Sequence, residues 1–112
     1  MIENYDFGAM VVDGTKYTAD LILLPGRINP SWWRKEGHRL NLEDIEDVLQ
    51  EDIEVLVIGT GFFGFMKVSS EVHQAVQSKG IVLRVEKTKK ATQIFNEFAA
   101  HKRTAGAFHL TC

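Results

Sequence analysis

Helix-like and strand-like patterns alternate along the second half of the chain, and this alternation constrains the fold more than any other feature. Apolar residues recur with helical spacing in three segments, over 42–49, 70–79 and 89–99. Short apolar runs follow these segments at 53–58, 81–86 and 105–110. Strands that alternate with helices predict right-handed crossovers and a sheet with helices packed on it.

The first half of the chain predicts a β-hairpin. Asp13-Gly14 lies between the apolar runs FGAMVV and TKYTADLILL, and such a pair favours a type I′ turn because both central residues need positive φ. We therefore expect antiparallel strands at about 6–12 and 15–24, which makes the sheet mixed. A length of 112 residues is enough for one domain. The fold class is α/β, with a mixed β-sheet, an N-terminal β-hairpin and about three helices.

Capping residues set the expected helix ends. Asn41 is placed as the N-cap of the first helix, with Asp44 at the third helical position. Ser69 and Thr88 are predicted to cap the second and third helices, and Gly80 stands where the second should end.

A glycine pattern follows the apolar run at 53–58. Gly59, Gly61 and Gly64 fit G-x-G-x-x-G, and Glu86 lies 22 residues after Gly64, where a ribose-binding acid is expected in a dinucleotide site. In that motif, however, the helix begins within the glycines, whereas the best cap here is Ser69. The three phenylalanines of FFGF would also crowd a ligand. The pattern therefore does not indicate a dinucleotide site.

Two interpretations of this loop remain open. In the first, Gly59 and Gly61 allow a tight exit from the strand, and the phenylalanines pack on the sheet end or form a contact surface. In the second, Gly59, Thr60 and Gly61 lie beyond the carboxyl end of a parallel strand, where α/β proteins bind ligands. Lys67 and the start of the Ser69 helix would then hold a small anion.

A second candidate segment is RINPSWWRKEGHRL, which shows no clean periodicity and is long for a connection. Trp33 and Arg34 are residue types that dominate protein interfaces, and His38 closes the segment. The structural alternative is that one tryptophan fills the core while the bases stay in water. Since neighbouring side chains of an extended chain point to opposite sides, we expect one of the two tryptophans to be exposed.

Composition excludes several function classes. A net charge of −2 argues against a nucleic-acid binder, and the chain has no run of 18 apolar residues that could span a membrane. The single cysteine, Cys112, indicates a reducing compartment, and we expect a cytoplasmic protein. His109-x-x-Cys112 offers only two ligands where zinc needs at least three, so we expect no metal. Apart from His109, no residue near Cys112 in sequence would activate its thiol, so we assign no catalytic residue. We also expect no cofactor.

Four stretches in a fixed order resemble one small domain family: LLPGRINPSWWRKEGH, VLVIGTG, TKKATQIFN and AGAFHLTC. This family includes the adipogenesis-associated protein of animals, assembly factor three of respiratory complex I, and bacterial and archaeal members. The resemblance implies a single three-layer α/β domain over residues 1–112. It also implies a glycine-x-glycine turn matched by Gly59 and Gly61, and an aromatic–asparagine pair matched by Phe95-Asn96. The family has no established enzymatic activity that could be carried over to this chain. No mitochondrial presequence is visible, so we do not carry over a complex I role.

The favoured hypothesis is a non-catalytic protein-interaction or scaffold/assembly module. It would contact protein partners through the 32–38 loop and the 62–65 segment, and a homo-oligomer is compatible with such surfaces. The alternative hypothesis is a small-anion or metabolite-binding protein, with an enzyme as one form of it. In that case Lys67 and Arg34 would supply positive charge beside Gly59–Gly61.

Overall fold

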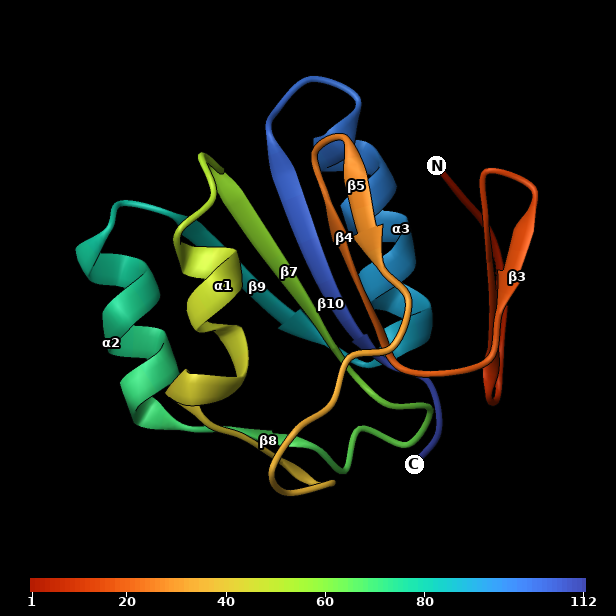
Figure 1. The fold of residues 1–112 in the computed structure, drawn as a ribbon, viewed down its shortest axis with the longest axis horizontal. Helices are drawn as coiled ribbons and strands as arrows, with labels where there is room; N and C mark the ends of the chain where they lie inside the picture. The colour runs from red at the N-terminus through yellow and green to blue at the C-terminus, as the bar shows by residue number, and fades with distance from the viewer.

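A five-stranded mixed sheet forms the centre of the computed structural model, which describes residues 1–112 (Figure 1). The strand order is β5-β4-β10-β7-β9, with β10 parallel to β7, β7 parallel to β9, and β4 antiparallel to β10 and to β5. The strands are β4 (Leu21–Leu24), β5 (Arg27–Asn29), β7 (Val55–Thr60), β9 (Val82–Glu86) and β10 (Thr104–His109). This arrangement confirms the mixed sheet predicted from the sequence.

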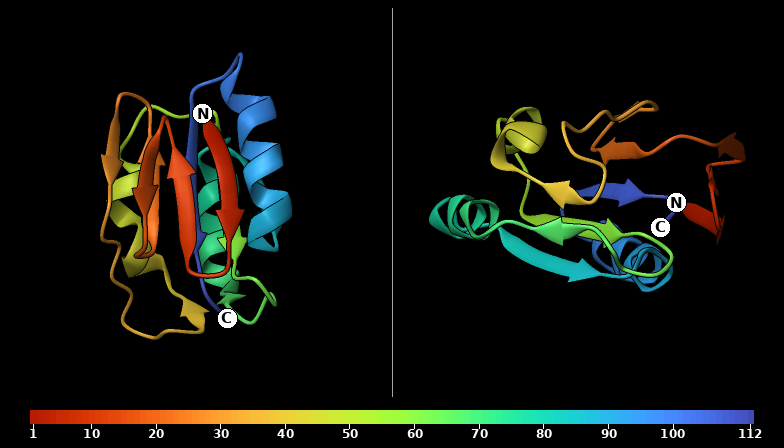
Figure 2. Two further views of the ribbon diagram at one scale, coloured as in Figure 1. Left: turned by 90° about the vertical axis from the view of Figure 1, so that its right-hand side faces the viewer. Right: turned by 90° about the horizontal axis from the view of Figure 1, so that it is seen from below.

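The two faces of this sheet are covered differently. One face carries a 3₁₀ turn (Leu42–Ile45), α1 (Glu46–Leu49) and α2 (Ser70–Ser78). The other carries α3 (Thr88–Ala99) and a small antiparallel sheet of β1 (Ile2–Asp6), β2 (Ala9–Val12) and β3 (Thr15–Tyr17). Figure 2, left, shows the small sheet facing the viewer, with α3 beside it. Because β7 is covered on both faces, all six of its residues are buried.

The predicted Asp13-Gly14 hairpin is confirmed. Asp13 and Gly14 have φ values of 48° and 81°, and Val12 pairs with Thr15 across the turn. The predicted strand over 15–24 is wrong as one element, because it divides into β3 and β4, which lie in different sheets. The division falls at the polar stretch before Leu21. Asp20 lies in this stretch, between the two strands, and its side chain belongs to the ion cluster described below.

Strand β1 was not predicted. Only Ile2 and Tyr5 of its five residues are buried, and the register shifts between Ile2 and Asn4, so the alternation of apolar and polar residues is broken. The side chain of Asn96 on α3 holds this strand. Its amide oxygen accepts from the Ile2 N–H at 2.9 Å and its amide nitrogen donates to the Ile2 carbonyl at 2.8 Å.

The helix ends follow the predicted caps with one exception. The Ser69 hydroxyl accepts from the Val72 N–H, and Gly80 has φ of 71° just after α2, as expected. Thr88 was predicted to be the N-cap of α3, but Lys87 occupies that position and Thr88 is the first helical residue. Its hydroxyl is used in a tertiary contact instead. No helix in the structure is long and apolar enough to cross a membrane.

Candidate functional site

The glycine loop lies where β7 and β10 end, beside the C-terminal residues of the chain (Figure 1). The Gly61 N–H donates to the Thr88 hydroxyl at 2.8 Å, and the Thr88 N–H donates to the Gly61 carbonyl at 3.1 Å. The Thr88 hydroxyl in turn donates to the His109 carbonyl at 2.6 Å. The first turn of α3 therefore fastens the loop to the end of β10.

Close packing explains the two glycines of the turn. A Cβ on Gly61 would lie 2.8 Å from the carbonyl oxygens of Thr111 and Cys112 and from the His109 ring, and its φ is 107°. A Cβ on Gly59 would lie 2.8 Å from the Thr88 hydroxyl. The N-terminus of α3 contacts Gly61 through Thr88. Residues 111 and 112 fill the space over Gly61, so the glycines line no open cleft of the kind a dinucleotide needs. These contacts favour the tight strand exit.

Three polar side chains form what we call the buried ion cluster: Arg34 and His109, which are buried, and Asp20, whose side chain is 18% exposed. One Asp20 carboxylate oxygen lies 2.7 Å from Arg34 Nη1 and 2.7 Å from His109 Nδ1. The other accepts from the Leu110 N–H at 2.8 Å, and Arg34 Nη2 donates to the Gly37 carbonyl at 2.9 Å. The cluster joins the β3–β4 link, the 32–38 loop and the end of β10.

The protonation of the cluster follows from this geometry. Burial raises the pKa of Asp20, but the hydrogen bonds from His109, the Leu110 N–H and Arg34 outweigh burial and leave that pKa below its usual value. An ionised carboxylate 2.7 Å from His109 Nδ1 assigns the proton to that nitrogen. His109 Nε2 is buried and has no partner. The contact with Asp20 fixes the orientation of the His109 ring.

The 32–38 loop separates its two tryptophans as predicted. Trp32 is buried at 7% exposure and donates from its indole to the Asp44 carbonyl, whereas Trp33 is 78% exposed. The expectation that the neighbouring bases stay in water is wrong for Arg34, which is 8% exposed. Asp20 neutralises this guanidinium, and the Trp32 ring lies 4.7 Å from it, which together offset the cost of desolvation.

Exposed phenylalanines gather at the glycine loop and form an aromatic patch. We define the patch as Phe7, Phe62, Phe63 and Phe65, each between 42% and 54% exposed. Ring centroids lie 5.8 Å apart for Phe7 and Phe62, 5.1 Å for Phe62 and Phe63, and 5.7 Å for Phe63 and Phe65. Phe7 comes from the β1–β2 turn, so the patch joins two segments that are distant in sequence.

His38 and Lys67 lie beside this patch. The Lys67 N–H donates to the His38 carbonyl at 2.8 Å in the short parallel pair of β6 (Arg39–Leu40) and β8 (Lys67–Val68). The His38 ring lies 6.3 Å from that of Phe65 and 6.1 Å from that of His109. The structure thus places these two residues near the glycine loop, whereas Trp33 lines a cavity formed with α1 and β5.

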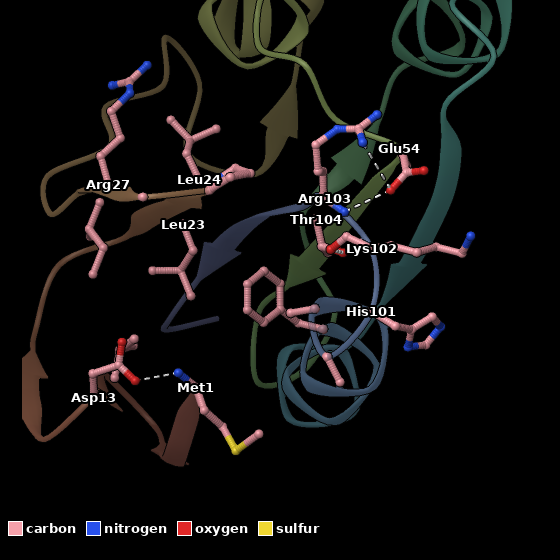
Figure 3. A pocket seen from close by; sticks show the side chains of 17 residues that line it. Met1, Asp13, Leu23, Leu24, Arg27, Glu54, His101, Lys102, Arg103 and Thr104 are labelled. Carbon is pink, nitrogen blue, oxygen red and sulfur yellow. Dashed lines mark hydrogen bonds and ion pairs between the residues drawn. The ribbon is translucent and has the colours of Figure 1, made fainter.

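A cavity of about 950 Å³ lies at the opposite end of the central strands, where β7 and β10 begin (Figure 3). Apolar residues such as Leu23 and Phe95 line it, together with charged residues. Both of its arginines are occupied, since Arg103 pairs with Glu54 and Arg27 pairs with Glu51. The two next cavities measure about 460 and 280 Å³. None of the three is lined by Gly59, Thr60, Gly61 or Lys67.

Sequence reasoning identified the glycine turn and the exposed tryptophan, but it missed three residues of this region. Asp20 interrupts the apolar run before β4, and this lone acid next to LILL was the available signal. Thr88 was interpreted only as a cap. Phe7 could be joined to the phenylalanines of the loop only after β1 was recognised, because a local pattern carries no information on distant pairing.

Comparison with known proteins places the chain in a family. A family model described as "Protein of unknown function (DUF498/DUF598)" matches residues 2–110. The chain belongs to this family. This family match and the similarity to a human assembly factor, described next, together confirm the resemblance inferred from the four stretches of sequence.

That human relative is "NADH dehydrogenase (ubiquinone) 1 alpha subcomplex assembly factor 3", which is 28% identical over 109 residues. The match covers 95% of this chain and 58% of the human protein, so the chain spans just over half the length of that relative. Conserved hypothetical protein PH1505 from Pyrococcus horikoshii OT3 superimposes with a TM-score of 0.85 at 29% identity, covering 100% of this chain and 99% of the other. MT938 gives a TM-score of 0.83 at 26% identity, covering 100% and 98%.

Proposed function

We propose that this domain is a non-catalytic protein-interaction module that acts in the assembly of a larger complex. The aromatic patch carries the proposal. Four phenylalanines in mutual ring contact remain open to solvent, although the chain has a core in which such side chains are normally buried. A contiguous exposed apolar surface of this kind marks a contact site, because its exposure to water is unfavourable until a partner covers it.

The patch is held in a fixed shape, which favours binding. The Phe62 N–H donates to the Thr111 carbonyl at 2.7 Å, and the Met66 N–H donates to the Thr60 carbonyl at 3.1 Å. Met66 is itself buried at 2% exposure, so the loop is anchored on both sides of the exposed rings. A loop ordered before binding loses little conformational entropy when a partner docks.

The human relative supports an assembly role, since its name describes an assembly factor. The partner that fits the patch is a protein with an exposed apolar surface, such as a subunit not yet joined to its complex. We further propose that the domain works in the cytoplasm, where its one cysteine stays reduced.

Photo-crosslinking in the producing cell tests this proposal. The photoreactive residue p-benzoylphenylalanine replaces Phe63 in one variant and Phe65 in a second. A third variant carries it in place of Val82, which is 48% exposed on the edge strand β9 and serves as the matched control. We expect both patch positions to crosslink to the same discrete protein, and the β9 position not to do so.

Two further results would bear on the proposal. Replacing Phe62 by Ser should abolish crosslinking from Phe63 while leaving the thermal unfolding midpoint nearly unchanged, because the Phe62 side chain is 42% exposed. Crosslinks of equal yield from Val82, or no crosslinked protein from either patch position, would reject the patch as the binding surface.

A further inference from the structure

The cavity of about 460 Å³ beside Trp33 lies apart from the aromatic patch and has different chemistry. Trp33 and Trp32 line it together with Ile22, Leu24 and Val48, so its floor is apolar and partly aromatic. Its volume lies within the range of sites that bind small groups. The indole of Trp33 is 78% exposed, the highest exposure of any large apolar side chain in the molecule.

Carboxylates stand on the α1 side of this cavity. Glu43, Asp44 and Asp47 line it, and they begin an acidic segment with seven acids and no bases from residue 43 to residue 54. Asp44 is occupied, because its carboxylate accepts from the Asn41 and Lys35 N–H groups. The carboxylates of Glu43 and Asp47 take part in no ion pair and accept no hydrogen bond.

Two bases also line the cavity, and they leave this excess of acid in place. Arg27 is paired with Glu51, a residue outside the lining. Lys35 is exposed and forms no ion pair, so it can turn into solvent. A guest of either charge would meet the open indole face. The two free carboxylates, however, would repel an anion and attract a cation.

We propose that this cavity binds an arginine side chain of a partner polypeptide. A guanidinium is planar, stacks on an indole and forms bidentate hydrogen bonds with carboxylates, so it fits Trp33 together with Glu43 and Asp47. The molecule already contains a related contact, since its own Arg34 lies 4.7 Å from the Trp32 ring beside the Asp20 carboxylate. The acids alone would not select a ligand, and the exposed indole in a cavity supplies the selectivity.

An NMR titration with N-acetyl-arginine methylamide tests the proposal. The indole N–H of Trp33 reports directly on the cavity, and the backbone amides of α3, which contributes no residue to the lining, are an internal reference. We expect a saturable shift of the Trp33 signal with a dissociation constant of about a millimolar, as suits a single side chain. N-acetyl-citrulline methylamide has nearly the same shape without the charge and should bind at least five-fold more weakly.

Variants separate the named groups from general electrostatics. Trp33→Ala should weaken binding about three- to five-fold, which is the contribution of an exposed cation–π contact. Because this variant lacks the indole signal, its binding is measured from the backbone amide signals of residues 43–48. A Glu43→Gln and Asp47→Asn double variant should abolish saturation. Glu71→Gln, which removes an exposed acid from the first turn of α2, should leave binding unchanged.

Three outcomes would overturn the proposal. The first is an equal response to the arginine and citrulline probes. The second is a response that Glu71→Gln lowers as much as the double variant does, since this would indicate unspecific attraction to acidic surface. The third is tighter binding of spermidine than of the arginine probe, because a flexible polyamine would then be the better guest and the site would not be selective for guanidinium.

Discussion

At the residue scale, a few side chains and one glycine hold together the segments at the carboxyl ends of β7 and β10. Gly61 lies against the C-terminal residues, Thr88 connects it to His109, and His109 belongs to the buried ion cluster with Asp20 and Arg34. Each of these residues has a partner that the sequence alone could not identify, because the partners lie between 14 and 89 positions away along the chain. The cost of replacing them follows from what each one contacts.

Gly61→Ala should destabilise the domain more than a positive φ alone explains. The added Cβ would meet two carbonyl oxygens and the His109 ring at 2.8 Å, so backbone must move. Gly26→Ala is the matched control, because Gly26 has φ of 81° and no atom within 4 Å of a new Cβ. We expect a loss of about 1–2 kcal/mol for the control and of at least about 3 kcal/mol for Gly61→Ala, measured by urea unfolding. Equal losses would contradict the close-packing explanation.

Arg34→Met should cost about 3 kcal/mol of unfolding free energy, because it leaves the part-buried Asp20 carboxylate without the guanidinium that neutralises it. Lys35→Met is the control at the neighbouring exposed position, and it should change stability by less than about 0.5 kcal/mol. Urea unfolding of both variants at neutral pH measures the difference. If the two variants were equally stable, Arg34 would not have the structural role described above.

Tyr5 should make stability depend on pH in the alkaline range. Burial and the nearby Asp20 charge raise the pKa of Tyr5 to about 12, and its hydroxyl donates to the Leu110 carbonyl at 2.8 Å. The folded state therefore favours the neutral phenol, while the unfolded chain ionises near its model value of 10.0. This stabilisation is complete below about pH 10 and is lost as the pH rises through 12.

The check compares the wild type with Tyr5→Phe, because other groups also titrate above pH 10. The difference in unfolding free energy between the two proteins should be constant from pH 7 to 9 and should shrink from pH 10 to 12. A constant difference over the whole range would show that ionisation of Tyr5 does not act on folding.

At the scale of elements, the sequence predicted what local patterns determine. The Asp13-Gly14 turn, the buried strand that became β7, the Ser69 cap and the end of α2 at Gly80 were all correct because each depends on neighbouring residues. Strand β1 was missed because its stability comes from a distant contact with Asn96 on α3. Thr88 was misplaced by one position because a tertiary contact took the hydroxyl that a cap would use.

Of the candidate site, the sequence indicated the surface residues but not their arrangement. An exposed tryptophan followed from the WW pair, whereas the burial of Arg34 depended on Asp20, which enters the loop from another element. The phenylalanines of FFGF were expected either to pack on the sheet end or to form a contact surface, and the sequence could not add Phe7 to them before the β1–β2 turn was placed beside them. Long-range pairing is the information that local pattern lacks.

Thr88→Val tests the connection between α3 and β10. Valine keeps the shape of threonine but cannot accept from the Gly61 N–H or donate to the His109 carbonyl, and both of those groups are buried. We expect a loss of about 2–4 kcal/mol for the two unsatisfied groups. Thr92→Val is the control, since that hydroxyl donates only to the Lys89 carbonyl within the same helix, and its loss should be below about 1 kcal/mol. Comparable losses in a thermal or urea denaturation would contradict the tertiary role of Thr88.

At the scale of the whole molecule, the two ends of the central strands β7 and β10 have different surroundings. At the carboxyl edge the glycine loop is closed by the C-terminal residues, and the aromatic patch lies on its outer side. At the amino ends of these strands lies the cavity of about 950 Å³, where Arg103 is paired with Glu54 (Figure 3). A closed loop under an open aromatic surface is suited to contact with another macromolecule, and the membership in a family with an assembly-factor relative agrees with such a role.

The most direct test of this account is the affinity of the purified domain for the protein that its patch captures by crosslinking, measured by isothermal titration calorimetry. A Phe63→Ser and Phe65→Ser double variant should bind at least about 30-fold more weakly, as expected for loss of interface hot spots of about 2 kcal/mol or more. Val82→Ser should bind like the wild type, and circular dichroism should show all three proteins folded. Unchanged affinity of the folded double variant would contradict the claim that the aromatic patch is the partner-binding surface.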